Sequence, residues 1–154
     1  MQTFLNPFGR IDPVTFRNAA LVLIATGAFL GLLPLINPGL AIVSFASMVL
    51  IYPWVVIWIK RFHDAGKSGA MFFAVFVPWL VTGILANQFI VKRFVDVPPV
   101  DPNFIWASMV AQLQASALAA TISGAIISLA FTLVVNEELK SDPAENAFGP
   151  PPGP

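Results

Sequence analysis

Four long runs without a charged residue constrain this chain more than any other feature of its sequence. They cover residues 18–36, 39–59, 70–90 and 104–135, and none of them contains Asp, Glu, Lys, Arg or His. About 20 apolar residues in a helix, at 1.5 Å each, cross the hydrocarbon core of a bilayer. Charged residues make up only 10% of the chain, whereas a soluble domain carries about 25%. The sequence therefore predicts an all-α integral membrane protein.

We predict four transmembrane helices joined by short loops, which form one membrane domain over residues 18–135. The last run has 32 residues, which is more than one crossing requires. We therefore expect residues 102–112 to form a separate interfacial or oblique segment before the fourth helix. The four spans are predicted at about 18–36, 39–59, 70–90 and 115–135.

The two ends of the chain are polar and short. Residues 1–17 form an entry segment, in which Asp12 before Pro13 favours the start of the first helix, because a carboxylate can accept hydrogen bonds from its free N–H groups. Residues 136–154 form a tail that is acidic at first and then rich in Pro. Polyproline II or disordered chain is expected at its end.

The distribution of Lys and Arg predicts the orientation in the membrane. With four spans, six of the eight basic residues lie on the side of the two termini, and only Lys92 and Arg93 lie on the other side. Cytoplasmic loops carry an excess of basic residues. Both termini and the loop between the second and third spans are therefore expected in the cytoplasm.

Composition and spacing argue against several classes of function. The chain has no Cys, one His and zero formal net charge, which exclude thiolate chemistry and give no case for nucleic acid as a partner. Gly66-Lys67-Ser68 resembles the end of a phosphate-binding loop, but Arg61 stands where that motif requires Gly, so no nucleotide site is predicted. The spans lack the ionisable groups typical of proton and ion pathways. We predict no catalytic, metal-binding or cofactor-binding residue, and a protein that is not an enzyme.

Residues 60–69 form the charged segment between the second and third spans. We expect Lys60, Arg61 and Lys67 to lie at lipid headgroups, where each basic residue gains about 1 kcal/mol from anionic lipid. Asp64 is expected to pair with a nearby Arg. Catalysis by His63 and Asp64 is the less favoured alternative, because no other nucleophilic or ligating residue lies near them in sequence.

The same segment contains helix-ending and helix-starting residues. Gly66 is expected to end the second helix, because Gly adopts the left-handed conformation found after many helices. Ser68 is expected to cap the start of the third helix. Tyr52, Trp54 and Trp58, just before this segment, are predicted to form an interfacial aromatic belt.

Small residues recur every four positions in two of the predicted spans. Side chains at this spacing share one helix face and allow another backbone to approach closely. We predict helix packing through this face, within the chain's own bundle in preference to contact with a different subunit. The residues are Gly27 and Gly31 in the first span, and Ser116, Ala120, Gly124, Ser128 and Thr132 in the fourth.

Three segments of the chain resemble one protein family. The stretch from Arg61 to Gly69 resembles the Arg-Leu-His-Asp-x-Gly-x-Ser-Gly signature of the bacterial inner-membrane proteins catalogued as domain of unknown function 805. Phe8-Gly9-Arg10 resembles the entry motif of that family, and the stretch from Asn146 to Pro152 resembles its closing motif. The resemblance implies a small multi-pass protein of the bacterial inner membrane, without an established activity or cofactor.

All three motif segments are predicted on the cytoplasmic side, and we expect them to form one cap. In this hypothesis Arg10, Arg61 and Asp64 form a charge network, and the tail folds back across it. A free, solvated tail is the alternative. The predicted cap residues are Arg10, Arg61, His63, Asp64, Gly66, Ser68, Gly69, Asn146, Phe148 and Gly149.

For function we favour a non-catalytic accessory or scaffold subunit that packs against a larger membrane complex, respiratory or photosynthetic. Its partners would be membrane lipids and other integral membrane subunits. The alternatives are a small transporter or channel, and a protein that acts on or binds lipid headgroups.

Overall fold

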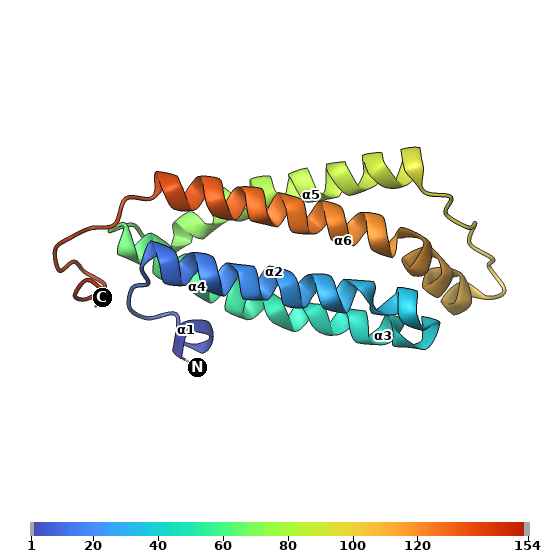
Figure 1. Cartoon of the computed structure of the whole chain (residues 1–154), viewed down its shortest axis with the longest axis horizontal. Coiled ribbons are helices and arrows are strands. Elements are labelled where there is room, and N and C mark those ends of the chain that lie inside the picture. Colours follow the sequence, from blue (N-terminus) through green and yellow to red (C-terminus); the bar gives the residue numbers. More distant parts are fainter. Residues whose placement is uncertain (1, 153–154) are drawn as a thin grey trace.

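The chain forms an elongated bundle of helices (Figure 1), and the computed structural model describes residues 2–152. There is no strand among these residues. Four helical segments are long and apolar enough to cross a membrane, and they confirm the predicted all-helical class. They comprise Pro13–Ile36, Pro38–Asp64, Gly69–Phe94 and Ile105–Glu138.

The entry segment leads into the first long helix as the sequence predicts. A short helix, α1 (Gln2–Leu5), precedes α2 (Pro13–Ile36). The Asp12 carboxylate accepts hydrogen bonds from the backbone N–H groups of Val14 and Thr15, both at 2.9 Å. Burial raises the pKa of the Asp12 carboxyl, but these bonds and one to the Thr15 side chain outweigh it and hold the pKa below its ordinary value.

The second long segment is not the single α-helix that the sequence predicts. It consists of η1 (Pro38–Leu40), α3 (Ala41–Ser44), η2 (Phe45–Leu50) and α4 (Ile51–Asp64). Pro53 lies in the first turn of α4, where its missing N–H costs no hydrogen bond. The α-helical ladder therefore starts just before Pro53, and the preceding residues adopt tighter 3₁₀ turns.

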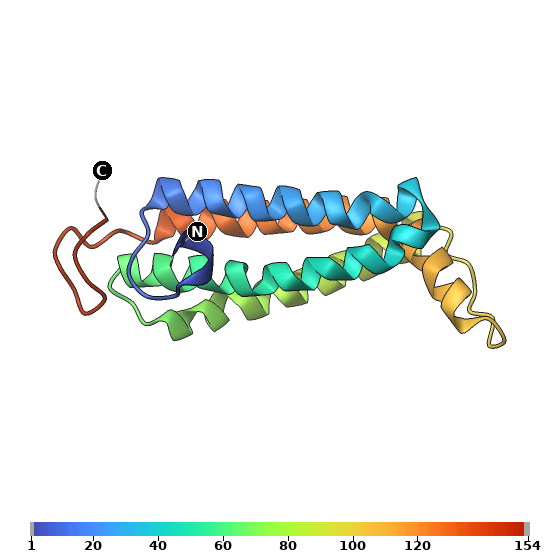
Figure 2. The ribbon, with the colours of Figure 1, turned by 90° about the horizontal axis from the view of Figure 1, so that it is seen from below.

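The third segment consists of η3 (Gly69–Met71) and α5 (Phe72–Phe94), and the fourth is α6 (Ile105–Glu138). The predicted oblique first part of the last run is present, but it is continuous with the rest of α6 and does not form a separate element (Figure 2). Neither Pro nor Gly occurs between Ile105 and Ser123 to interrupt it. Figure 2 shows the first turns of α6 at an angle to the rest, so the helix changes direction without a break.

The long helices are neighbours in the order α5, α6, α2 and α4. α2 packs along α6 more extensively than against any other element, α5 packs along α6, and α4 packs along α2. Figure 1 shows α4 and α5 close together at the end of the bundle where the chain termini lie, and farther apart toward the opposite end. This divergence leaves α5 at the edge of the bundle.

The apolar core is concentrated at the end of the bundle near the termini. Phe16 of α2 meets Trp58 of α4 edge-to-face, with ring centroids 4.7 Å apart, and Phe62 and Phe72 belong to the same cluster. Trp58 is only 1% exposed. The predicted interfacial aromatic belt is therefore wrong for Trp58, which packs in the core.

The small residues of α2 and α6 differ in what they face. A Cβ at Gly31 would lie 2.6 Å from Oγ1 of Thr121, so Gly31 allows the close approach of α2 to α6. A Cβ at Gly27 would make only an ordinary contact with Leu50, at 3.8 Å. Nothing lies within 4 Å of a Cβ built at Gly124, so this residue does not bring another helix of the bundle close, and its contact with a different subunit stays a prediction.

The other members of the α6 series make their own contacts. Ser116 donates a hydrogen bond to the backbone carbonyl of Gln112 within the helix, and Ser128 accepts one from Trp79 of α5. Thr132 is fully buried near the core. Ala120 and Gly124 both line a cavity that lies between the helices. The series therefore packs against α5 and the core at one end and borders open space at its middle.

Candidate functional site

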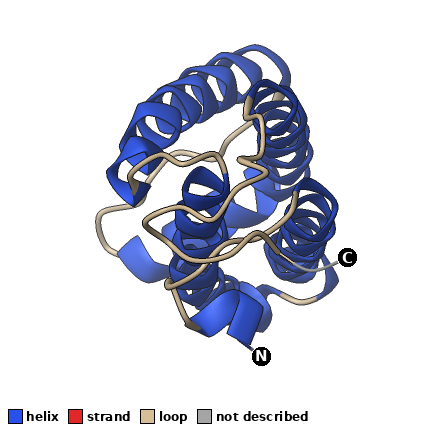
Figure 3. Ribbon diagram, turned by 90° about the vertical axis from the view of Figure 1, so that its left-hand side faces the viewer, coloured by secondary structure: helices blue, strands red, loops and turns tan. Residues whose placement is uncertain are grey.

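A polar cap closes the end of the bundle where α2 begins and where α4 and α6 end. We define the cap as residues 8–12, 60–69 and 136–150. Figure 3 looks onto this end and shows loops crossing over the helix ends. Residues from all three motif segments meet here, although more than 130 positions separate the first from the last. The fold therefore assembles the cap from both ends and the middle of the chain.

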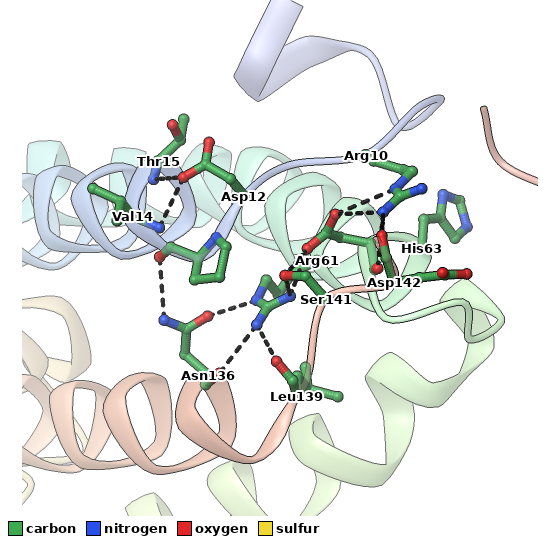
Figure 4. A network of polar contacts seen from close by, with 12 residues as sticks. Arg10, Asp12, Val14, Thr15, Arg61, His63, Asn136, Leu139, Ser141 and Asp142 are labelled. Atoms are coloured by element: carbon green, nitrogen blue, oxygen red, sulfur yellow. Dashed lines mark hydrogen bonds and ion pairs between the residues drawn. The ribbon is translucent and has the colours of Figure 1, made fainter. Parts of the chain in front are cut away.

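The carboxylate of Asp64, the last residue of α4, lies at the centre of the cap. Its Oδ1 accepts from Arg10 at 3.1 Å, and its Oδ2 accepts from Arg61 at 2.9 Å. The Ser141 hydroxyl donates to the same Oδ2. Asp64 and Arg61 are fully buried, and the side chain of Arg10 is 1% exposed. A single carboxylate thus bridges two guanidinium groups that are shielded from water (Figure 4).

Arg61 connects α4 to the end of α6. Its Nε donates to the side-chain carbonyl of Asn136 at 2.6 Å, and its Nη2 donates to the backbone carbonyls of Asn136 and Leu139. The last carbonyls of a helix lack partners within the helix and carry partial negative charge. Arg61 therefore satisfies the end of α6 and offsets the unfavourable position of Glu137 and Glu138 there.

Arg10 connects the entry segment to the tail. Its guanidinium donates to the backbone carbonyls of Ala144 at 2.7 Å and Gly149 at 3.3 Å, and also to that of Asp142. It also reaches the backbone carbonyl of Asp64, at 3.3 Å. The single Asp64 carboxylate balances the charge of only one of the two guanidinium groups. The partial negative charge of these carbonyl oxygens stabilises the other.

The tail is folded back against the other two segments of the cap, as the sequence predicts. It contains an isolated bridge between Asn146 and Gly149. The Asn146 side chain donates to the backbone carbonyl of His63 at 3.1 Å. The His63 ring stacks on Phe148 with centroids 3.8 Å apart and planes 3° apart. Nδ1 of His63 lies 3.2 Å from the Gly9 carbonyl. The only histidine thus contacts both the tail and the entry segment.

Glycines with positive φ allow the chain to turn in each motif segment. Gly66 has φ of 67° directly after α4, and the N–H groups of Gly66 and Lys67 bond to the carbonyls of His63 and Phe62. This pattern is a Schellman cap, and it agrees with the predicted helix end. Gly9 and Gly149 also have positive φ, of 85° and 116°.

The start of the third segment also agrees with the sequence prediction. The Ser68 hydroxyl accepts from the backbone N–H of Ala70 at 3.3 Å. A Cβ at Gly69 would lie 2.8 Å from Cγ2 of Ile59, so this Gly lets η3 approach α4 closely.

The prediction that the basic residues of this segment lie at lipid headgroups is wrong for Arg61. Its guanidinium is enclosed by Asp64, Asn136 and Leu139 and has no exposed surface. Lys60 is also buried, at 8% exposed, whereas Lys67 is exposed. Arg61 stabilises the helix ends and is not available to lipid.

Sequence reasoning missed several cap residues between Asn136 and Asp142. Asn136 joins α6 to α2 as well as to α4, because its side-chain amide donates to the Pro13 carbonyl at 3.1 Å. The backbone N–H of Asp142 donates to the Asp64 carbonyl at 2.8 Å. The only sequence signal was that Asn136 is the amide at which the last apolar run ends.

The arrangement holds the helix ends together. The ionisable side chains at its centre already contact one another, the backbone or an aromatic ring. Both oxygens of Asp64 accept from cationic donors, and the His63 ring is held between a carbonyl and an aromatic face. The effect of a buried ion pair on stability is largest when one partner is removed, because the remaining charge is then buried without compensation.

Replacement of Asp64 tests this role. We expect Asp64→Asn to destabilise the protein by about 3–5 kcal/mol, because two buried guanidinium groups lose the carboxylate that pairs with both. Thermal unfolding in detergent, followed by near-ultraviolet circular dichroism, measures the loss.

The matched control is Glu145→Gln, which removes an exposed carboxylate from the same tail. A surface change of this kind is expected to alter stability by less than about 0.5 kcal/mol. Equal stability of the two variants would show that the buried carboxylate does not hold the cap together.

Comparison with known proteins matches the chain to one sequence family. No curated protein and no solved structure is significantly similar to the chain. A sequence family described as protein of unknown function (DUF805) matches residues 5–150, a range that includes Arg10, Asp64 and Gly149. This match covers nearly the whole chain and all three segments of the cap, and the chain therefore belongs to the DUF805 family.

Proposed function

We propose that this chain is a non-catalytic integral membrane protein that serves as an accessory or scaffold subunit of a larger membrane complex. The observation that carries the proposal is that the charged residues at the centre of the cap contact other parts of this chain and stabilise its fold. Asp64 bridges Arg10 and Arg61, and His63 is stacked on Phe148. The two residues best suited to acid–base chemistry therefore hold the fold together.

The exposed face of α5 supports a role in subunit contact. Of the 23 residues of α5, only Phe72 is buried. Large apolar side chains recur every four residues on its exposed side, and we call this set the outer stripe of α5. The outer stripe consists of Phe73, Val77, Val81, Leu85 and Phe89.

The proposed partner is another integral membrane subunit, which would cover the outer stripe within the bilayer. Lipid alone can also cover apolar side chains, so the experiment has to separate the two. Phe89 of α5 and Phe29 of α2 form a matched pair, because they are 66% and 63% exposed. Phe29 lies on the helix that the bundle itself covers most.

Photocrosslinking from these two positions in native membranes tests the proposal. With benzoylphenylalanine in place of Phe89, we expect one adduct with a different membrane protein, and the same protein should copurify stoichiometrically after gentle extraction. Benzoylphenylalanine in place of Phe29 should give no such adduct. An adduct only with a second copy of this chain, or recovery of the chain with lipid alone, would overturn the proposal.

We also propose that the protein lies in the bacterial inner membrane with the cap in the cytoplasm. The basis is that Arg10, Arg17, Lys60, Arg61, Lys67 and Lys140 lie at or near the cap, whereas Lys92 and Arg93 end α5 at the opposite end of the bundle. An excess of Lys and Arg marks cytoplasmic loops.

Single cysteines can test this orientation, because the chain has none of its own. Lys67→Cys and Asn103→Cys place exposed thiols near the cap and in the loop at the opposite end. In spheroplasts, an impermeant maleimide should label Asn103→Cys directly and Lys67→Cys only after permeabilisation. The reverse pattern would place the cap outside the cytoplasm.

A further inference from the structure

A cavity of about 470 Å³ lies inside the bundle, between the cap and the opposite end. Its volume is within the range of sites that bind small molecules. All four long segments contribute to its wall. Its lining includes Gly27, Ile51, Trp54, Trp79, Leu80 and Gly124.

Small side chains on α2 and α6 create the space. Gly124 lines the cavity, and nothing lies within 4 Å of a Cβ built on it. Gly27 and Ala120 line the same space. The α6 residues that the sequence assigns to helix packing therefore border the cavity at the middle of the bundle.

The cavity opens sideways, between α4 and α5. Ile51 of α4 and Leu80 of α5 line it and are also 52% and 42% exposed. These are the two helices that diverge away from the cap (Figure 1). Because both belong to segments that can cross a membrane, the mouth faces the hydrocarbon of the bilayer.

The wall favours an apolar occupant. Trp54 and Trp79 lie side by side in it, with ring centroids 6.3 Å apart. The Trp79 indole N–H, which could bind a polar solute, donates to the Ser128 hydroxyl at 3.0 Å. Water occupies a cavity when it finds two to four polar partners, and this wall is mainly aromatic and aliphatic.

An empty space of this volume would be costly, because the atoms of its wall would lose their packing partners. The bilayer supplies a flexible hydrocarbon chain directly at the mouth. We propose that the cavity is a binding site for one acyl chain of a membrane lipid, which enters between α4 and α5 and packs against Trp54 and Trp79. This inference goes beyond the accessory role and does not depend on any protein partner.

Quenching of tryptophan fluorescence by brominated lipid tests the proposal with the purified full chain. Bromine atoms quench an indole on contact. The probe is a vesicle of phosphatidylglycerol and phosphatidylethanolamine with bromine at the middle of the acyl chains. Trp106→Phe removes the exposed tryptophan at the start of α6, and Trp58, at 1% exposed, is shielded in the core. The signal that lipid can reach then comes from Trp54 and Trp79.

Two leucine variants, each made in the Trp106→Phe protein, serve as the test and its matched control. Gly124→Leu places a side chain in the cavity, and Gly83→Leu adds the same group to α5 at a position that also has nothing within 4 Å but does not line the cavity. We expect brominated vesicles to quench the parent and Gly83→Leu strongly, and Gly124→Leu to lose the greater part of this quenching.

Equal quenching in Gly124→Leu and Gly83→Leu, or an unquenched parent, would overturn the proposal. Near-ultraviolet circular dichroism verifies that each variant is folded. Ala120→Leu blocks the same cavity from a neighbouring turn of α6 and replaces Gly124→Leu if that variant does not fold. Because no other protein is present, failure here is distinct from failure of the subunit proposal.

Discussion

The bridge that the Asp64 carboxylate forms between Arg10 and Arg61 is the interaction on which the rest of the structure depends. Burial of three ionised groups is unfavourable unless each finds compensating partners. Here the surplus positive charge lies against backbone carbonyls of Asn136, Leu139 and Ala144. The network therefore fixes the end of α4, the end of α6, the entry segment and the tail relative to one another.

The two parts of the molecule are stabilised by different physical interactions. At the cap, directional hydrogen bonds define how the helix ends meet, and the aromatic cluster around Phe16 and Trp58 packs directly beneath it. Farther along the bundle the helices are held mainly by packing, closely where Gly31 meets Thr121 and loosely around Gly124, with a few side-chain hydrogen bonds such as that from Trp79 to Ser128. Because α4 and α5 lie close together near the cap and diverge toward the opposite end (Figure 1), a lateral opening follows from this arrangement.

The sequence predicts those features that depend on local chemistry. Charge-free runs indicate the four segments, Asp12 and Gly66 mark a helix start and a helix end, and charge pairing anticipates the contacts of Asp64. The shared cytoplasmic side of the three motif segments also predicts that Arg10, Asp64 and the tail meet in one cap, but other contacts between distant residues are not predicted. The charge and sequence position of Arg61 are those of a headgroup-binding residue. In the structure, however, it is enclosed by Asn136 and Leu139, which lie 75 and 78 positions later in the chain. The place of Trp58 at the end of a span predicts an interfacial position for it, and four-residue spacing predicts a helix contact for Gly124, but packing puts Trp58 in the core and leaves Gly124 facing a cavity.

Hydrogen exchange of the tail amides in the intact protein tests the central claim most directly. In the closed cap, the N–H of Asp142 donates to the Asp64 carbonyl, and Asn146 and Gly149 bond to each other's carbonyls. These three amides should therefore exchange much more slowly than in an unstructured peptide of the same sequence, because exchange requires the cap to open. Exchange at the rate of the free peptide would show that the tail is solvated and that the charged signature does not form a closed cap.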